Sequence, residues 1–155
     1  MERKELLILQ QFRKNARENL TRTSRRTGIP VSTIYKKKKK YQGTLIKKHT
    51  VLLDFSQLGY ALKVIMAMKV PPAQRSEVTQ YLHGHHRINS LYKITSGYDV
   101  MVEAIFRNLK EYQIFCESID KFPIQDRQEF FIIEDIKQEE FLANDAYLDI
   151  LEEQL

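Results

Sequence analysis

The stretch RRTGIPVSTIYKKKKKY, residues 25–41, contains two helix boundaries and a run of five lysines. Gly28 is suited to end the preceding helix, because glycine adopts left-handed backbone angles without strain. Pro30 suits the start of a new helix. Ile34 and Tyr41 are seven residues apart and therefore share one helical face, which we expect to be buried. The sequence thus predicts a helix, a tight turn and a second helix whose exposed side is cationic.

The flanking sequence completes a winged helix-turn-helix pattern. Apolar residues spaced three apart between residues 6 and 12 predict a first helix. Asn19 is suited to cap a second helix over residues 20–27. Gly43 ends the third helix, and LIKKHTVLLDF, residues 45–55, is a predicted strand in the position of a wing. Three short helices followed by a strand are typical of this DNA-binding fold.

Positive charge is concentrated at the start of the chain. Residues 1–50 hold 15 lysines and arginines against three acids, whereas the other 105 residues hold 10 against 17. Such a basic segment is typical of nucleic-acid binding, because neutralised phosphates release condensed counterions. The alternative interpretation is a solvated basic surface without a partner. We therefore predict two modules, of which the first contacts a polyanion.

The third predicted helix supplies most of the candidate contacts to double-stranded DNA. In a helix-turn-helix, the first residues of this helix reach base edges, and other residues contact phosphates. Since a lysine ammonium is a flexible point charge, the run favours affinity over sequence choice. The residues predicted near bases are Ser32, Thr33, Tyr35 and Lys36. Those predicted at phosphates are Lys37, Lys39 and Lys40 of this helix, Lys47 and Lys48 of the wing, and Arg22, Arg25 and Arg26 of the second helix.

The rest of the sequence shows strand and helix patterns in the order of a ferredoxin-like plait. That order, βαββαβ, gives an antiparallel sheet with both helices on one face. An amphipathic pattern in residues 139–155 predicts an extra C-terminal helix. The predicted fold class is therefore α+β. The predicted strands are 60–70, 88–96, 98–106 and 127–136, and the predicted helices are 76–84 and 108–122.

Cysteine content and apolar run length bear on the compartment. Cys116 is the only cysteine, so no internal disulfide is possible and a reducing cytoplasm is expected. The apolar run Leu6–Leu9 is too short for the core of a signal peptide. Residues 60–70 are interrupted by Lys63 and fall short of the roughly 20 residues of a spanning helix. No membrane partner is expected.

Several segments, taken in order, resemble the leucine-responsive regulator (Lrp/AsnC) family across residues 2 to about 138. ILQQFRKNAR is similar to the family's first helix, and RRTGIPVSTIYKKKKK to its turn and recognition helix. LIKKHTVLLDFSQLGY is similar to its connector strand, and FPIQDRQEFFIIEDIKQ to its last strand. TSGYDVMVEA is similar to its ligand loop. No single motif is specific, but the ordered set is.

The resemblance implies a transcription regulator, not an enzyme, that binds pseudo-palindromic DNA as a homodimer, tetramer or octamer. No cofactor is implied. A small-molecule effector, such as an amino acid, is implied at an interface near the ligand loop. An ordinary turn, with Tyr98 packed and Asp99 accepting backbone amides, is the alternative interpretation of that loop. The predicted ligand-binding residues are Thr95, Ser96, Gly97, Tyr98 and Asp99.

The family pattern divides the chain into four predicted segments. Residues 1–48 are the winged helix-turn-helix DNA-binding domain, and residues 49–60 are a connector strand. Residues 61–138 are the ferredoxin-like domain for ligand binding and oligomerisation, and residues 139–155 are the C-terminal helix.

Four residues depart from the family pattern. Lys38 stands where an apolar residue normally faces the core, so we expect its ammonium to extend outward. Thr23 and Thr27 likewise occupy positions that are usually apolar, which indicates a thin core. Ser96 stands where a glycine is usual in the ligand loop.

Other functions remain open on the sequence alone. An architectural or RNA-binding protein would show steep salt dependence without a preferred duplex. Siroheme decarboxylases resemble the same two-module layout, but the plait lacks clustered histidine, arginine and tyrosine. HGHH, residues 83–86, has histidines suited to metal binding, yet a polar helix end is the favoured interpretation and no metal site is predicted. Cys116 is expected to be a core thiol.

Overall fold

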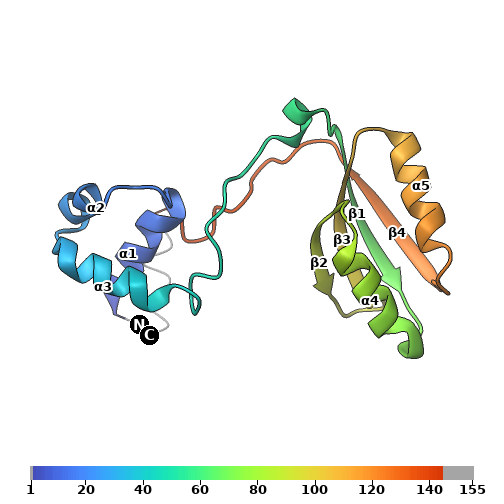
Figure 1. The fold of residues 1–155 in the computed structure, drawn as a ribbon, viewed down its shortest axis with the longest axis horizontal. Helices are drawn as coiled ribbons and strands as arrows, with labels where there is room; N and C mark the ends of the chain where they lie inside the picture. The colour runs from blue at the N-terminus through green and yellow to red at the C-terminus, as the bar shows by residue number, and fades with distance from the viewer. Residues whose placement is uncertain (1, 145–155) are drawn as a thin grey trace. The chain divides into compact units, whose positions relative to one another are not determined.

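The computed structural model of the protein describes residues 2–144, which form two compact units (Figure 1). The N-terminal unit comprises residues 2–52 together with 136–144, and the plait unit comprises Leu53–Asp135. Each unit has a buried apolar core of its own. No helix in the described part of the chain is long and apolar enough to cross a membrane.

Three helices form most of the N-terminal unit: α1 (Arg3–Lys14), α2 (Leu20–Thr27) and α3 (Val31–Tyr41). Asn19 caps α2, because its side-chain oxygen accepts a backbone N–H at 2.8 Å. Gly28 ends α2 in the left-handed conformation, with φ 69°. The helix boundaries predicted on either side of this glycine are therefore confirmed.

The core of the N-terminal unit is small. Ile34 is completely buried and Tyr41 is 7% exposed, which confirms the predicted inward face of α3. Leu20 packs against the cluster from its edge. Since few apolar side chains are buried here, each contributes a large share of the stability of this unit. The buried cluster comprises Ile8, Phe12, Ile29 and Ile34.

The polar residues at usually apolar positions find partners inside the N-terminal unit. The hydroxyl of Thr23, which is fully buried, donates to the carbonyl of Asn19 at 3.3 Å. Thr27 donates to the carbonyl of Thr23 at 2.8 Å. The ammonium of Lys38 lies 5.0 Å from the centre of the Phe12 ring, a cation–π contact. These contacts reduce the cost of a core with fewer apolar groups.

The strand predicted over residues 45–55 is wrong. Ile46 makes a single bridge with Gln42, and residues 47–54 belong to no helix or strand. A strand needs a neighbour to satisfy its backbone groups, and no described segment of the unit pairs with this one beyond the bridge. The short helix η1 (Phe55–Leu58) follows instead.

A clamp made by Arg13 of α1 holds the segment that follows the plait. Its Nη2 donates to the Glu139 carboxylate at 2.7 Å and to the Glu139 carbonyl at 2.9 Å. Its Nε donates to the carbonyl of Phe141 at 3.1 Å. Residues 139–144 form turns, so the predicted C-terminal helix is wrong for these residues, and its remainder, 145–155, lies outside the described residues. The N-terminal unit thus combines residues 2–52, which precede the plait, with residues 136–144, which follow it.

The plait unit has the predicted βαββαβ order, with sheet order β2-β3-β1-β4 and every neighbouring pair antiparallel. The short helix η2 (Pro72–Gln74) precedes α4. This is an α+β fold, as predicted. Its elements are β1 (Leu62–Lys69), α4 (Arg75–Gly84), β2 (Ile88–Lys93), β3 (Val100–Phe106), α5 (Leu109–Ile119) and β4 (Asp126–Ile132).

One face of the sheet is covered and the other is open. Val78 and Leu82 of α4, with Phe115 and Ile119 of α5, pack on alternate residues of β1 and β3. Cys116 lies in this core, as predicted, and burial raises the pKa of its thiol. The residues between them point to the opposite face, which no described element of the plait unit covers. That open face carries Ile65 of β1, Met101 of β3, and Phe130 and Ile132 of β4, whereas Ala67 and Ile105 on the same face are buried.

Candidate nucleic-acid interface

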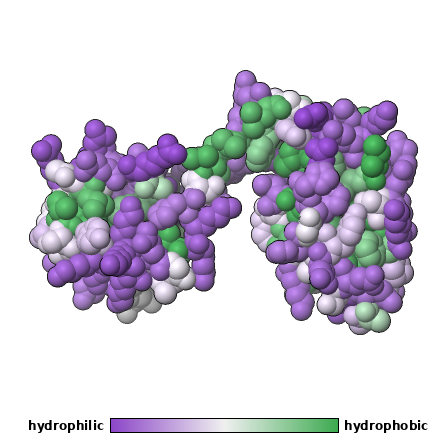
Figure 2. Space-filling view, viewed as in Figure 1, coloured by the Kyte–Doolittle hydropathy of each residue, from purple (hydrophilic) through white to green (hydrophobic). Residues whose placement is uncertain are grey.

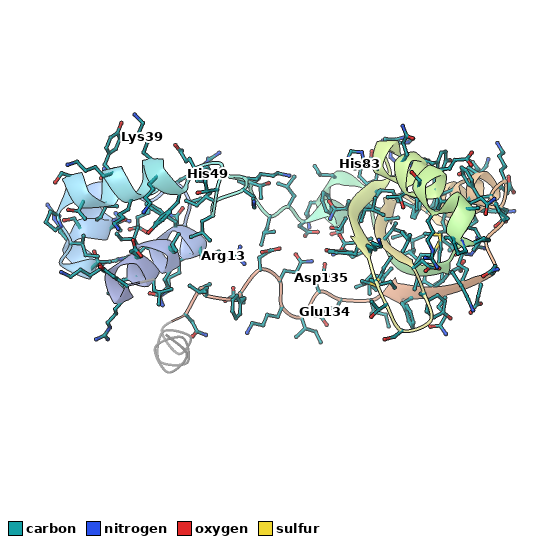
Figure 3. All side chains as sticks on the ribbon, turned by 90° about the horizontal axis from the view of Figure 1, so that it is seen from below. Arg13, Lys39, His49, His83, Glu134 and Asp135 are labelled. Atoms are coloured by element: carbon teal, nitrogen blue, oxygen red, sulfur yellow. The ribbon has the colours of Figure 1, made fainter. Side chains whose placement is uncertain are left out.

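Helix α3 has a cationic side opposite Ile34, and most of its residues predicted to contact DNA lie there. Ile34 turns inward, so residues on the other side of the helix, including Ser32 and Thr33, are exposed. Tyr35 is 56% exposed. Hydrophilic side chains cover much of the visible surface of the N-terminal unit in Figure 2, and Figure 3 shows Lys39 extending outward from α3. We call Lys36, Lys39 and Lys40 the cationic face; all three are exposed and form no ion pair with a described residue.

Lys37 lies apart from the cationic face. Its ammonium contacts the carboxylate of Glu5 on α1, and its side chain is only 31% exposed. This ion pair holds the pKa of Glu5 at about 2 and raises the pKa of Lys37. Nearby, burial raises the pKa of Tyr41 to about 12. Lys37 therefore joins α3 to α1 instead of extending toward a ligand.

The Glu5–Lys37 pair predicts an acid-sensitive N-terminal unit. The pKa of Glu5 falls from an ordinary 4.5 to about 2, so its charge stabilises the fold above pH 4.5 and that stabilisation is lost as the pH falls through about 2. Glu5→Gln should remove this dependence while lowering stability at neutral pH. Thermal unfolding measured from pH 5 to pH 2 would test it, with exposed Glu140→Gln as the control. Parallel curves for the wild type and Glu5→Gln would contradict the assignment.

The remaining predicted cations lie on α2 and on the segment after α3. Arg22, Arg25 and Arg26 are exposed on α2. Arg22 and Arg26 both contact the buried carboxylate of Glu18, whereas Arg25 forms no ion pair with a described residue. Lys47 and Lys48 are exposed on the irregular segment that replaces the predicted wing strand. The structure thus brings together cations of α2, α3 and the following segment in one unit.

The predicted ligand loop lies in the plait unit between β2 and β3. The carboxylate of Asp99 accepts the N–H of Val70 at 2.8 Å and lies 2.6 Å from Nη2 of Arg75. The hydroxyl of Tyr98 donates to Asp126 at 2.8 Å. These two side chains therefore hold the loop to its own unit.

The tip of the loop is exposed at Thr95, Ser96 and Gly97. Ser96 and Gly97 both have positive φ, 69° and 99°. Serine rarely adopts this conformation, whereas glycine does so without strain, which accounts physically for a glycine preference at position 96. What the loop offers a ligand is thus mainly backbone groups and two small hydroxyls.

Comparison with known proteins decides the family. The family model described as the Lrp/AsnC ligand binding domain matches residues 63–142. The chain belongs to the Lrp/AsnC family. The HTH-type transcriptional regulator FL11 of Pyrococcus horikoshii is 30% identical over 117 residues, which cover 75% of this chain and 78% of FL11. An uncharacterized HTH-type transcriptional regulator of the same organism is 25% identical over 135 residues, covering 86% and 91%.

Two solved structures share the fold of this chain. AsnC of E. coli superimposes with a TM-score of 0.77 at 18% identity, covering 89% of this chain and 95% of AsnC. The regulator NMB0573 of Neisseria meningitidis, solved as a complex with L-Met, superimposes with a TM-score of 0.82 at 17% identity, covering 89% and 93%. At these identities the comparison shows the fold alone.

Sequence reasoning about this Lrp/AsnC member missed three acids that organise the candidate sites. Glu5 pairs with Lys37, Glu18 with the α2 arginines, and Asp126 with Tyr98. Only Glu18 had a local signal, because it lies four residues before Arg22, the helical spacing of an ion pair. The other two contacts join residues far apart in the sequence.

The histidine-rich stretch lies at the end of α4. The ring of His85 stacks on His86 and meets Phe115 edge-on, with centroids 4.8 and 4.9 Å apart. Burial lowers the pKa of His85. No group of three or more potential ligands that could hold a metal ion occurs in residues 2–144. In the structure, His85 is an aromatic packing residue at a helix end.

Proposed function

We propose that this Lrp/AsnC protein is a transcription regulator that binds duplex DNA with the N-terminal unit, and that α2, the Gly28 turn and α3 act as its helix-turn-helix. The observation that carries the proposal is the cationic face, which is exposed on the helix that would enter the major groove. The HTH-type regulators among its relatives support a binding function in place of catalysis.

Within this proposal, α3 divides into two parts. Ser32, Thr33 and Tyr35 lie near its N-terminus, where a recognition helix contacts base edges. The cationic face lies one to two turns further on, where phosphate contacts are expected. Lys37 joins α3 to α1 through its ion pair with Glu5 and is not among the proposed DNA contacts.

We further propose that the protein acts as a homodimer or higher oligomer. Ile65, Phe130 and Ile132 lie on the open face of the sheet, and Phe130 is 53% exposed. Pairing two such faces would bury apolar side chains that a single copy leaves in water. A two-fold dimer would present two copies of α3 to the two halves of a pseudo-palindromic site.

An effector site at the tip of the ligand loop is also proposed. The exposed Thr95–Gly97 segment offers backbone N–H and C=O groups, which suit the polar ends of a small molecule such as an amino acid. The L-Met complex of the Neisseria relative supports that class of ligand. An effector bound where copies meet could change assembly without contacting DNA.

Selection of bound sequences from a random duplex pool at about 150 mM salt tests the proposed function. At that salt concentration nonspecific phosphate contacts are substantially weakened. We expect enrichment of a pseudo-palindrome whose half-sites are about one helical turn apart. Retained binding without any enriched sequence would contradict site-specific regulation and favour the architectural alternative, while preference for single strands or RNA would favour an RNA-binding protein.

A further inference from the structure

One buried carboxylate just before α2, that of Glu18, contacts two exposed arginines of this helix. The side chain of Glu18 is 4% exposed, and its Oε2 accepts a hydrogen bond from Nη1 of Arg26 at 3.3 Å. Its Oε1 lies 3.7 Å from Nε of Arg22, which is an ion-pair distance without a hydrogen bond. A single anion thus holds two cations.

The outer edges of both guanidinium groups remain in solvent. The side chain of Arg22 is 68% exposed and that of Arg26 is 53% exposed. They are four residues apart on α2 and therefore lie on one face. Each guanidinium has five N–H donors, most of which Glu18 leaves unused. Two adjacent guanidinium groups with free N–H donors are suited to bind phosphate oxygens.

Burial makes the arrangement persistent. A buried carboxylate without a cationic partner is costly, so Glu18 keeps both arginines beside it. A long side chain that is already ordered loses less conformational entropy when it meets a phosphate. We infer that Glu18 is a positioning residue, which holds Arg22 and Arg26 as a paired phosphate anchor on α2. This inference rests on the proposed binding of DNA.

If Glu18 acts only through its charge, Glu18→Gln should bind DNA more tightly. If Glu18 positions the two arginines, the same variant should bind DNA more weakly. Removal of a negative charge beside DNA strengthens attraction to phosphates. Loss of the carboxylate that orients both arginines weakens binding. Because two long side chains are ordered by this contact, we expect Glu18→Gln to bind a random-sequence duplex of about 30 base pairs about three- to tenfold more weakly. Glu140→Gln makes the same charge change at an exposed acid of the same unit and should bind as tightly as the wild type or more tightly.

A second set of variants preserves charge. Arg22→Lys combined with Arg26→Lys keeps both cations but removes the two guanidinium groups, and should weaken binding without changing the salt dependence. Adding Glu18→Gln to this pair should cause no further loss, because the anchor is already gone. Arg17→Lys, at an exposed arginine of the same unit that is not among the predicted DNA contacts, is the matched control and should bind like the wild type. Thermal unfolding of every variant shows whether the N-terminal unit remains folded.

Each outcome decides between positioning and charge. If Glu18→Gln binds the duplex as tightly as the wild type, or more tightly, the inference that Glu18 positions the two arginines is wrong. A further loss when Glu18→Gln is added to the two lysine substitutions would also contradict it. If the wild-type protein fails to bind the duplex, the proposed function is rejected together with the anchor, whereas wild-type binding with an unaffected Glu18→Gln variant rejects the anchor alone.

Discussion

Replacing Lys36, Lys39 and Lys40 together with glutamine is expected to weaken duplex binding about 150-fold at about 150 mM salt. Each neutralised phosphate contributes about 0.9 to the slope of log K against log salt, which corresponds to roughly five- to sixfold in affinity at this concentration. The slope should therefore also decrease by about 2.7 in magnitude. All three side chains are exposed and form no ion pair with a described residue, so their loss should leave the fold intact.

Two comparisons make this result specific to the cationic face. The same charge change in the plait unit, made by replacing Lys93, Lys110 and Lys121 with glutamine, should alter affinity and slope much less. Lys37→Gln should change the slope little, because its ammonium is already neutralised by Glu5. Fluorescence anisotropy over a salt series measures both quantities. Equal losses for the two triple variants would show that net charge, not the cationic face, drives binding.

Ile34→Ala is expected to unfold the N-terminal unit selectively. The side chain is completely buried in a cluster of four apolar residues, and truncating such a group costs about 2–5 kcal/mol. A core this small has little stability in reserve. Since the plait unit has its own core, its strands should stay folded. DNA binding should be lost with the helices.

Residue-resolved hydrogen exchange on the full chain measures this selectivity. Amides of α3 should lose protection in Ile34→Ala, while amides of β1 and β3 keep theirs. Val31→Ala, on the same helix at a position that is 40% exposed, should change little. Simultaneous loss of protection in both units would show that they unfold as one cooperative body and would contradict the prediction.

Structural features that depend on residues close together in the sequence were predicted correctly. The seven-residue spacing of Ile34 and Tyr41 correctly placed the inward face of α3, and Gly28 correctly placed the turn. The strand-like apolar runs in residues 60–70 and 98–106 identified the central strands of the plait, β1 and β3. Local periodicity determines these features, so no knowledge of distant contacts was needed.

The errors concern contacts between distant residues. The predicted wing needed a pairing partner that local pattern does not supply, and only one bridge formed. Lys37 was predicted at a phosphate, and its ion pair with Glu5 could not be foreseen, although it lies three residues after Ile34 and four before Tyr41, on the edge of the inward face. Its partner Glu5 is 32 residues away. Likewise, Tyr98 finds Asp126 only because the sheet brings the two strand ends together.

The Arg13 clamp has a consequence for the order in which the protein is made. Glu139 and Phe141 are synthesised 126 and 128 residues after Arg13, so a ribosome produces the whole plait before the last part of the N-terminal unit exists. The helices emerge first, yet their unit is completed last. The N-terminal unit can therefore be completed only after the whole plait has been synthesised, because Glu139 and Phe141 follow the plait in the chain.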